Sequence, residues 1–311
     1  MTSIVIPAHN EGRVIGRLLD ALLADASADP STRVPGSEET DIVVVCNGCT
    51  DDTARVAGAR GPRVRVVEIP TPSKHTALRI GDEHARGFPR LYVDADVVVG
   101  AADVRELTAA LAASPGLLAA APAREVPLTG CAWPVRAYYR VWQRLPAVRE
   151  GLFGRGVIAV SEPGHARIAA LPPLMADDLA ASLAFGPGER RVVESARVVV
   201  HPPRTWSDLI KRRIRAATSS AEVEHFQASR PAGGPSGQGA PSGPEPLSAP
   251  SAPSARTSTA DLRALLRAQP RLLPGVVVFV VAALAARRGS RKAIRNRDFS
   301  TWLRDESSRR G

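Results

Sequence analysis

The chain has 311 residues, 44% of them hydrophobic and 23% charged, so it can bury one large core or two modest ones. Its formal net charge of +10 indicates an anionic partner, which leaves nucleic acid, an anionic membrane surface and phosphorylated substrates as candidate classes. Three cysteines are too few for a disulfide framework, and the first residues show no signal-peptide pattern, so we expect a cytoplasmic protein.

Apolar strand-like runs alternate with helix-like runs over the first two thirds of the chain. Strands are predicted at 3–7, 41–46, 63–69 and 90–96, and helices are predicted to begin at Asn10, Thr50 and Ser73. Continuous apolar strands interleaved with helices predict an α/β fold with a mixed, mostly parallel sheet and helices on both faces. Ligands of such sheets bind at the carboxyl ends of the strands, so the residues after each strand are the candidate site.

The turn after the second predicted strand contains Cys46 and Cys49 in a C-x-x-C spacing. A cysteine at a helix N-terminus acquires a lowered pKa, so one interpretation is a thiol redox centre. A zinc site would need two more ligands at similar spacing, and the one other cysteine in the sequence is Cys131. In the other interpretation Cys46 is a small hydrophobic side chain that ends a buried strand, and Asn47 and Gly48 form the turn.

Charged residues follow the third and fourth predicted strands. Lys74 begins the helix after the third strand, where it is either a solvated surface charge or a ligand for phosphate. Asp94 and Asp96 end the fourth strand, and residues i and i+2 of an extended backbone point to the same side. Two converging carboxylates suit Mn²⁺ or Mg²⁺, which can bridge a diphosphate. The alternative is a turn with two solvated acids.

Two further charged groups lie beyond the alternating region. Asp178 is in the first turn of an amphipathic helix, where it either complements the helix dipole or acts as a general base toward a hydroxyl. A basic helix follows at 205–220, and its guanidinium groups can clamp a diphosphate: Arg212, Arg213 and Arg215. That helix lacks interleaved aromatic residues, and the sequence has no zinc-finger or helix-turn-helix signature, which argues against nucleic acid.

The composition changes after the basic helix. Residues 226–258 are rich in Pro, Gly, Ser and Ala, which predicts a disordered linker between a domain at 1–225 and a C-terminal helical segment at 259–311. The apolar run at 272–286 would be about 22 Å long as a helix, against about 30 Å for a bilayer core, and Pro274 and Gly275 shorten it further. A full membrane span is therefore not expected. Because arginines flank the run, it is predicted either to lie at a membrane interface or to pack on the domain.

Taken in order, the sequences at these strand and helix ends resemble the motifs of family 2 glycosyltransferases, which are inverting sugar transferases of the GT-A fold. The matching strings are IVIPAHNE, CNGCTDDT, SKHTALRIG, DAD and ADDLAASL, and the resemblance extends over about residues 1–220. The Gln-x-x-Arg-Trp signature and multiple membrane helices of the processive members are missing from the sequence. The resemblance therefore implies a non-processive enzyme.

The resemblance also implies a mechanism and residue roles. A nucleoside-diphosphate sugar would donate its sugar to an acceptor hydroxyl, with Asp178 as catalytic base and with Mn²⁺ or Mg²⁺ held by Asp94 and Asp96. The implied donor-binding residues are Pro7, His9, Glu11, Asn47, Lys74, Asp94, Arg212, Arg213 and Arg215. The family commonly has an aspartate near Asn47 that accepts the N3–H of uracil. Asn47 can accept through its amide oxygen but can also donate, so a UDP-sugar is expected ahead of a GDP-sugar while guanosine donors stay open.

The expected acceptor is a lipid-linked or cell-envelope glycan at the inner face of the cell membrane, and no nucleic-acid partner is expected. A nucleotidyltransferase is one alternative, but it would normally have a Gly-rich basic loop after the first strand, where this chain has only Gly12 and Arg13. A second alternative is a thiol redox protein that uses Cys46 and Cys49. A third is a non-catalytic scaffold at a membrane surface that uses the basic tail, but the presence of Asp94, Asp96 and Asp178 argues against it.

Overall fold

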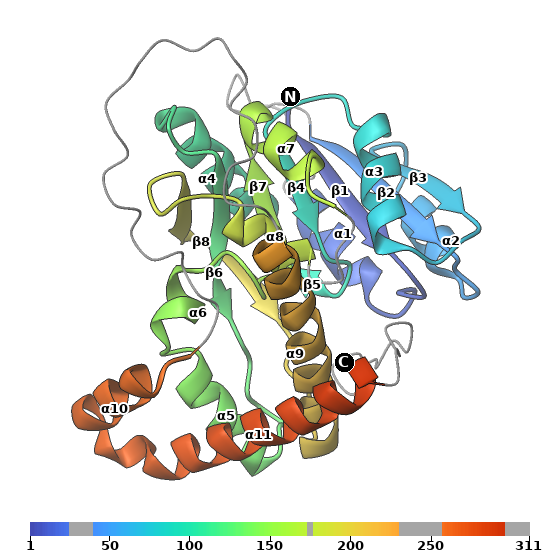
Figure 1. Ribbon diagram of the computed structural model, residues 1–311. Helices are drawn as coiled ribbons and strands as arrows, with labels where there is room; N and C mark the ends of the chain where they lie inside the picture. Colours follow the sequence, from blue (N-terminus) through green and yellow to red (C-terminus); the bar gives the residue numbers. More distant parts are fainter. Residues whose placement is uncertain (25–39, 173–176, 230–256, 296–311) are drawn as a thin grey trace.

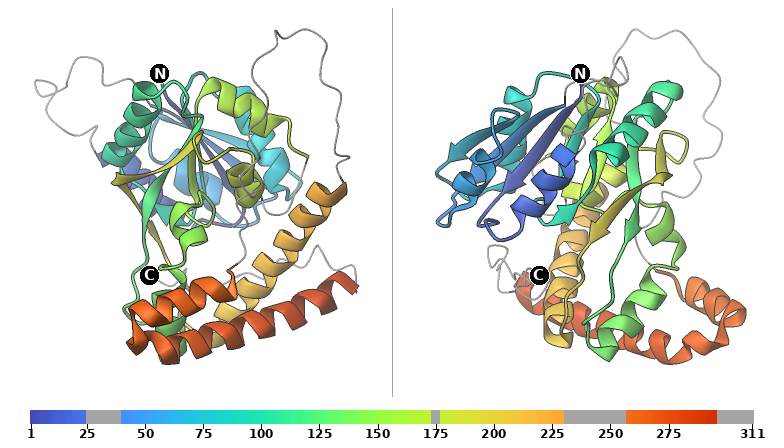
Figure 2. Two further views of the ribbon diagram at one scale, coloured as in Figure 1. Left: turned by 60° about the vertical axis from the view of Figure 1, so that its left-hand side comes forward. Right: turned by 180° about the vertical axis from the view of Figure 1, so that it is seen from behind.

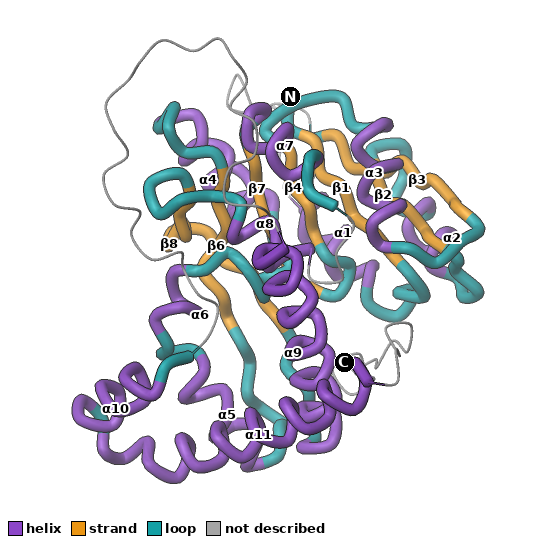
Figure 3. Tube along the Cα trace, in the orientation of Figure 1, coloured by secondary structure: helices purple, strands orange, loops and turns teal. Residues whose placement is uncertain are grey.

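The computed structural model describes residues 1–24, 40–172, 177–229 and 257–295. Within these ranges eight strands form one sheet in the order β3-β2-β1-β4-β7-β6-β8-β5 (Figures 1 and 3). The strands are β1 (Ser3–Ala8), β2 (Asp41–Asn47), β3 (Val64–Ile69), β4 (Arg90–Val93), β5 (Val97–Val98), β6 (Ala119–Glu125), β7 (Val157–Val160) and β8 (Arg190–Val200). The pairs β1–β2, β1–β4, β2–β3 and β6–β8 are parallel, and β4–β7, β6–β7 and β5–β8 are antiparallel. The predicted mixed, mostly parallel sheet is confirmed.

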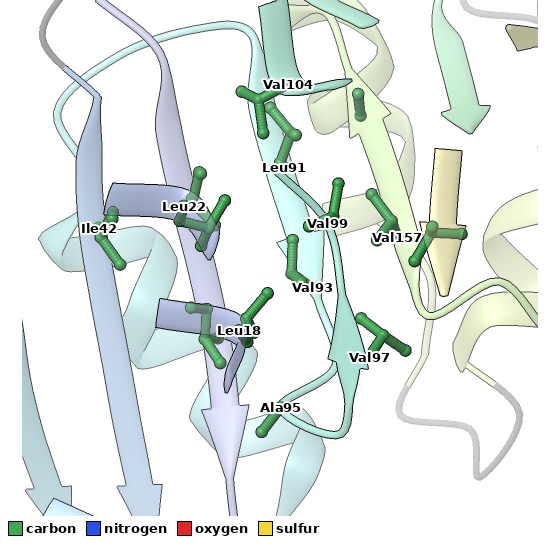
Figure 4. Close-up of a cluster of buried hydrophobic side chains, with 14 of the residues drawn as sticks. Leu18, Leu22, Ile42, Leu91, Val93, Ala95, Val97, Val99, Val104 and Val157 are labelled. Carbon is green, nitrogen blue, oxygen red and sulfur yellow. The ribbon is translucent and has the colours of Figure 1, made fainter. Parts of the chain in front are cut away.

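Helices cover both faces of this sheet. They are α1 (Ile15–Leu23), α2 (Thr53–Gly58), α3 (Lys74–His84), α4 (Ala101–Ala113), α5 (Trp133–Trp142), α6 (Pro146–Glu150), α7 (Glu162–Ala169), α8 (Asp177–Leu183), α9 (Trp206–Ser229), α10 (Thr259–Ala268), the short 3₁₀ helix η3 (Pro270–Leu272) and α11 (Leu273–Arg295). The largest core cluster lies between the sheet and α1, α2 and α4, and smaller clusters lie under α3, α7 and α8 on the other face. Figure 4 shows Leu18 and Leu22 of α1 beside strand residues such as Val93.

The central strands are apolar throughout because neither face of them meets water. In β1, Ile4 and Ile6 belong to the cluster under α1, and Val5 points to the opposite face, where it lies against Gly81 of α3. A Cβ at Gly81 would overlap Val5 Cγ1, so the glycine lets α3 approach the sheet closely. These contacts fix the strand ends at which the candidate site lies.

A helical cluster made of α5, α9, α10 and α11 lies at the end of the molecule toward which β1 runs (Figures 1 and 2). Tyr138 of α5 is fully buried there and stacks on Phe279 of α11, with ring centroids 5.2 Å apart. The C-terminal segment therefore packs on the domain along one face of α11, which was one of the two predicted arrangements.

Several predicted boundaries differ from the structure. Helix α1 begins at Ile15 instead of Asn10, and α2 begins at Thr53 instead of Thr50. Helix α3 begins as predicted, with Ser73 Oγ accepting the Thr76 N–H at 3.2 Å. Helix α9 continues to Ser229, into the predicted linker at 226–258, of which residues 230–256 lie outside the described residues.

The C-terminal apolar helix is longer than predicted. Pro274 lies in its first turn, where proline is compatible with a helix, so α11 runs for 23 residues instead of about 15. Residues 270–291 reach a length and mean hydropathy (1.7) that would suffice to cross a membrane, and 28% of the most apolar stretch is buried in the protein.

Candidate active site

The loops that follow β1 and β2 are bonded directly to each other. Asn10 has a left-handed backbone (φ 53°), which asparagine tolerates better than most residues. Its Oδ1 accepts the N–H groups of Thr50 at 2.7 Å and Asp51 at 3.3 Å. The backbone N–H of Glu11, which is 8% exposed, donates to Thr53 Oγ1 at 2.8 Å. These bonds satisfy loop backbone groups across the two strand ends and hold the two loops as one unit.

Asp51 completes the connection between these loops. Its Oδ2 accepts the Gly12 N–H at 3.0 Å, and its Oδ1 accepts the Thr53 N–H at 3.1 Å. Partial burial alone would raise the pKa of Asp51, but the hydrogen bonds from Thr53 and Gly12 outweigh burial and hold the pKa below its usual value. A Cβ at Gly12 would lie 3.1 Å from Asp51 Oδ2 and 3.3 Å from the Thr53 backbone nitrogen, so any larger residue would crowd this connection.

The Asn47 side chain joins three structural elements. Its Nδ2 donates to the Ala8 carbonyl at 2.8 Å, and its Oδ1 accepts the Ser73 N–H at 3.1 Å. The Asn47 carbonyl in turn accepts a hydrogen bond from His9 Nδ1 at 2.6 Å. Pro7 is buried in β1 and His9 is half-buried. Asn47 therefore connects the ends of β1 and β2 to the start of α3.

A cavity of about 410 Å³ opens beside the ends of β2 and β3. It is lined by Cys46, Gly48, Cys49, Thr50, Glu68, Ile69 and Pro70. Burial, with a smaller contribution from Cys49, raises the pKa of Cys46 to about 12, so this thiol is protonated at neutral pH. A redox C-x-x-C motif needs a lowered thiol pKa, and the structure therefore favours the packing interpretation of Cys46. Glu68 was not singled out from the sequence, although it occupies a predicted strand end.

Lys74 and Asp94 form an ion pair. Lys74 Nζ, at the start of α3, lies 2.8 Å from Asp94 Oδ1, and the two side chains are 30% and 39% exposed. The Asp94 N–H donates to the Gly156 carbonyl at 2.8 Å, which ties the end of β4 to the loop before β7. Two predicted site residues that lie 20 positions apart in sequence are thus in direct contact.

Asp96 lies near His201, which was not among the predicted site residues. Strands β5 and β8 pair with Val97 opposite Val200, so Asp96 and His201 each lie one residue beyond the last paired position, close enough for the Asp96 charge to act on the imidazole. Burial lowers the pKa of His201, and nearby Arg17 lowers it further, while the Asp96 charge acts in the opposite direction. The neutral imidazole, which is the metal-binding form, is therefore favoured. Among the described residues, no three His, Cys, Asp or Glu side chains are close enough to enclose a metal ion as they stand.

Asp178, at the start of α8, is held by two backbone donors. Its Oδ2 accepts the Gly154 N–H at 2.8 Å, and its Oδ1 accepts the Leu179 N–H at 2.7 Å. The loop that supplies Gly154 is organised by Arg155, which is 3% exposed and donates to the Gly151 carbonyl at 3.0 Å and the Pro122 carbonyl at 2.9 Å.

A second arginine, Arg124, supports the same loop by donating to the Phe153 carbonyl at 3.2 Å. Burial and, to a lesser extent, the neighbouring Arg155 lower the pKa of Arg124 to about 9, so it still carries its charge at neutral pH. The nearby Asp178 carboxylate acts against this lowering. Neither arginine was predicted as a site residue, because their roles depend on loop carbonyls that no sequence pattern indicates.

The three predicted arginines of α9 have different surroundings. Arg212 Nη1 donates to the His201 carbonyl at 3.2 Å, so this guanidinium lies at the end of β8. The Arg213 guanidinium lies 5.9 Å from the centre of the Tyr138 ring and faces the helical cluster. Arg215 is half-buried further along the same helix. Arg212 therefore contacts the end of β8 directly.

Comparison with known proteins defines the class of this enzyme. Residues 3–160 match the model of glycosyl transferase family 2, which is half of the chain. The chain therefore belongs to this family, and it is a glycosyltransferase, as the sequence motifs predicted. No curated protein sequence matches it.

Solved structures show the same GT-A fold. One is a mannosyltransferase, PcManGT, from Pyrobaculum calidifontis in complex with GDP-Man and Mn²⁺, with 18% identity, a TM-score of 0.56 and coverage of 99% of this chain and 84% of that chain. Another is glucosyl-3-phosphoglycerate synthase from Mycobacterium tuberculosis in complex with Mn²⁺, UDP-Glc and phosphoglyceric acid, with 20% identity, a TM-score of 0.53 and coverage of 75% and 82%.

Proposed function

We propose that this glycosyltransferase is metal-dependent and inverting, and that it moves a sugar from a nucleoside-diphosphate sugar to an acceptor hydroxyl in a non-processive reaction. The observation that supports the proposal is the pairing of β5 with β8, which places Asp96 and His201 just beyond its paired ends, two positions after Asp94 of the Lys74–Asp94 ion pair. The two structures of similar fold, which contain GDP-Man with Mn²⁺ and UDP-Glc with Mn²⁺, support it.

The residues at this strand end fit a divalent ion that is held jointly with a ligand. Asp96 would offer a carboxylate and His201 a neutral imidazole, and Asp94 would be a third ligand if Lys74 turned to the donor. Mn²⁺ accepts both oxygen and imidazole nitrogen, and phosphate oxygens commonly complete such open sites. When bound, the ion supplies positive charge that stabilises the departing diphosphate. The donor set favours Mn²⁺ over Mg²⁺, which prefers oxygen alone.

The chain's own residues supply the remaining chemistry. Asp178 takes the proton of the acceptor hydroxyl, the hydroxyl oxygen bonds to the anomeric carbon, and the bond from that carbon to the diphosphate oxygen breaks on the opposite side. Arg212, which contacts the His201 carbonyl, balances negative charge on the leaving group. The result is inversion at the anomeric carbon. Arg213 and Arg215 would act indirectly, through the position of α9.

The donor's base is proposed to enter the cavity beside β2 and β3. Both ends of the Asn47 amide already bond to backbone groups, so Glu68, which lines the cavity, is the better candidate to accept an N–H of the base. A carboxylate accepts the single N3–H of uracil or the two adjacent N–H groups of guanine. His9, Glu11 and Pro7 would line the nucleoside side of the same edge.

The test is a thermal-shift screen of UDP, GDP and their sugars, each with and without Mn²⁺ or Mg²⁺. We expect at least one diphosphate compound to raise the melting temperature only when the metal is present. Asp96→Ala and His201→Ala should abolish the metal-dependent part of this shift. The matched control is Asp20→Ala, which removes an exposed acid that pairs with Arg60 away from the site. If no diphosphate compound stabilises the protein, the proposal is wrong.

Stereochemistry is tested separately with water as the acceptor. Proton NMR of slow donor hydrolysis should show that the first sugar released from an α-linked donor is the β anomer. Release of the α anomer would rule out inversion while leaving the transferase assignment intact. We further propose that the natural acceptor is a lipid-linked or cell-envelope glycan at the cytoplasmic face of the membrane, a location that the net charge of +10 supports.

A further inference from the structure

Helix α11 has one face that is packed on the protein. Its Val276, Phe279, Ala282 and Ala286 are buried at spacings of three and four residues. A Cβ at Gly275, near the start of the helix, would lie 3.1 Å from the Ala137 carbonyl oxygen of α5, and Gly289, near its end, lies directly against Ile214 of α9. The helix is therefore in contact with the protein along its length, and it lies flat across α5 and α9 (Figure 2).

The opposite face of α11 is apolar and exposed. We call it the lipid face and define it by its five residues: Leu273, Val277, Val280, Val281 and Leu284. Their side chains are 39–55% exposed, and in the described part of the chain they are five of the seven large hydrophobic residues with such exposure. Their spacing follows one side of a helix, so they form a continuous stripe. An apolar stripe of this kind indicates a surface that is covered in the working protein.

Exposed arginines lie beyond both ends of the lipid face. One and two helical turns after Leu284, Arg288 and Arg291 are exposed, and Arg287 is exposed beside them. At the other end the exposed arginines are Arg263, Arg267 and Arg271. Residues 257–291 contain six arginines and a single acid, Asp261. An apolar stripe between two basic ends complements an anionic bilayer, because the arginines meet the headgroups while the stripe enters the acyl boundary.

We propose that the lipid face of α11 binds an anionic membrane surface, with the helix lying in the plane of the interface. The helix is long enough to cross a bilayer, but crossing would expose the buried face and break the stack of Tyr138 on Phe279. Lying flat keeps these contacts. Because the helical cluster lies at the end toward which β1 runs, this orientation turns the carboxyl edge of the sheet toward the membrane side (Figure 1). The inference does not depend on the proposed reaction.

The test is co-sedimentation of the full chain with sucrose-loaded vesicles. Vesicles of phosphatidylcholine with about one third phosphatidylglycerol should pellet the protein, and pure phosphatidylcholine should pellet far less of it, because each basic residue near the surface adds to binding. Val277→Asp with Val281→Asp should abolish binding. Arg287→Glu with Arg288→Glu should weaken it by about tenfold or more. The matched control, Arg79→Glu with Arg191→Glu, makes the same change in net charge at exposed positions on α3 and β8 and should bind nearly as well as the wild type.

Circular dichroism of each variant establishes that it is folded, which is expected because every substituted side chain is exposed. Three results would overturn the proposal: absence of binding to anionic vesicles, unchanged binding by the aspartate variant, or equal weakening by the charge control. Retention of the wild-type protein in vesicles after an alkaline carbonate wash would show a spanning helix instead. A wild-type dimer that Val277→Asp converts to a monomer would show that the lipid face pairs with a second copy.

Discussion

Replacing Asp178 by asparagine separates its proposed catalytic role from its structural one. The carboxylate accepts two backbone N–H groups, from Gly154 and Leu179, and asparagine can accept only one of them because its amide nitrogen is a donor. A hydrogen bond to a charged acceptor contributes about 1.5–3 kcal/mol, so Asp178→Asn should lower the free energy of unfolding by about that amount. Loss of a general base should also lower turnover by about 10²–10⁴-fold.

The chain offers a matched control for this experiment. Asp103 at the start of α4 also accepts two backbone N–H groups, from Gly100 at 3.0 Å and Arg197 at 2.8 Å. Asp103→Asn should therefore show a similar loss of stability in urea unfolding but keep its turnover. Both variants should keep the metal-dependent thermal shift with the donor nucleotide. Undiminished turnover in Asp178→Asn would refute the base assignment, and an equal loss in Asp103→Asn would show that destabilisation alone explains the effect.

Three further predictions follow from packing and protonation. Gly81→Ala should lower the free energy of unfolding by about 1–2 kcal/mol, because the new Cβ would overlap Val5. Gly58→Ala is the control and should not destabilise the protein, because its new Cβ would lie 4.0 Å from the nearest neighbour. Cys46 should resist iodoacetamide at neutral pH until the protein unfolds, because burial keeps it as a thiol; rapid labelling of the native protein would contradict this. Burial lowers the pKa of His165 below 6.5, so the unfolded chain binds more protons than the folded one at mildly acidic pH. The free energy of unfolding should therefore fall as the pH drops through about 6.5. In urea unfolding at a series of pH values, His165→Gln should show a shallower fall.

The parts of the fold that the sequence predicted are those set by local periodicity. The runs at 3–7 and 41–46 are apolar because helices cover both faces, and the structure forms β1 and β2 there. The predicted helix starts at Asn10 and Thr50 were wrong because these residues form hydrogen bonds with each other's loop instead of capping a helix. A polar residue before a helix is a local signal, and it cannot show that its partner lies 40 residues away.

The predicted site residues remain predictions, but some of their positions can be compared with the structure. Lys74 and Asp94, found from the alternating pattern, form an ion pair. Asp94 and Asp96 do not end one extended strand as predicted, because β4 ends at Val93 and Asp96 lies in the turn before β5. His201 could not be found from the alternating pattern, because its proximity to Asp96 depends on the pairing of β5 with β8 across about 100 residues of chain. The support of the Asp178 loop by Arg155 also depends on long-range contacts, through the Pro122 carbonyl. The length of α11 was underestimated because Pro274 was taken to shorten the helix, whereas it lies in the first turn.

The pairing of the two-residue strand β5 determines when, during synthesis of the chain, the proposed metal site can form. In the described part of the chain β5 pairs with β8 alone, and β8 (Arg190–Val200) lies outside the residues that match the family model. While the chain is being synthesised, β1 to β4 can assemble as soon as they leave the ribosome, but the turn at Asp96 has no outer strand until about 200 residues have emerged. We therefore expect a nascent chain that ends before β8, and so lacks the β8 residues of the largest core cluster, to show no metal-dependent nucleotide binding.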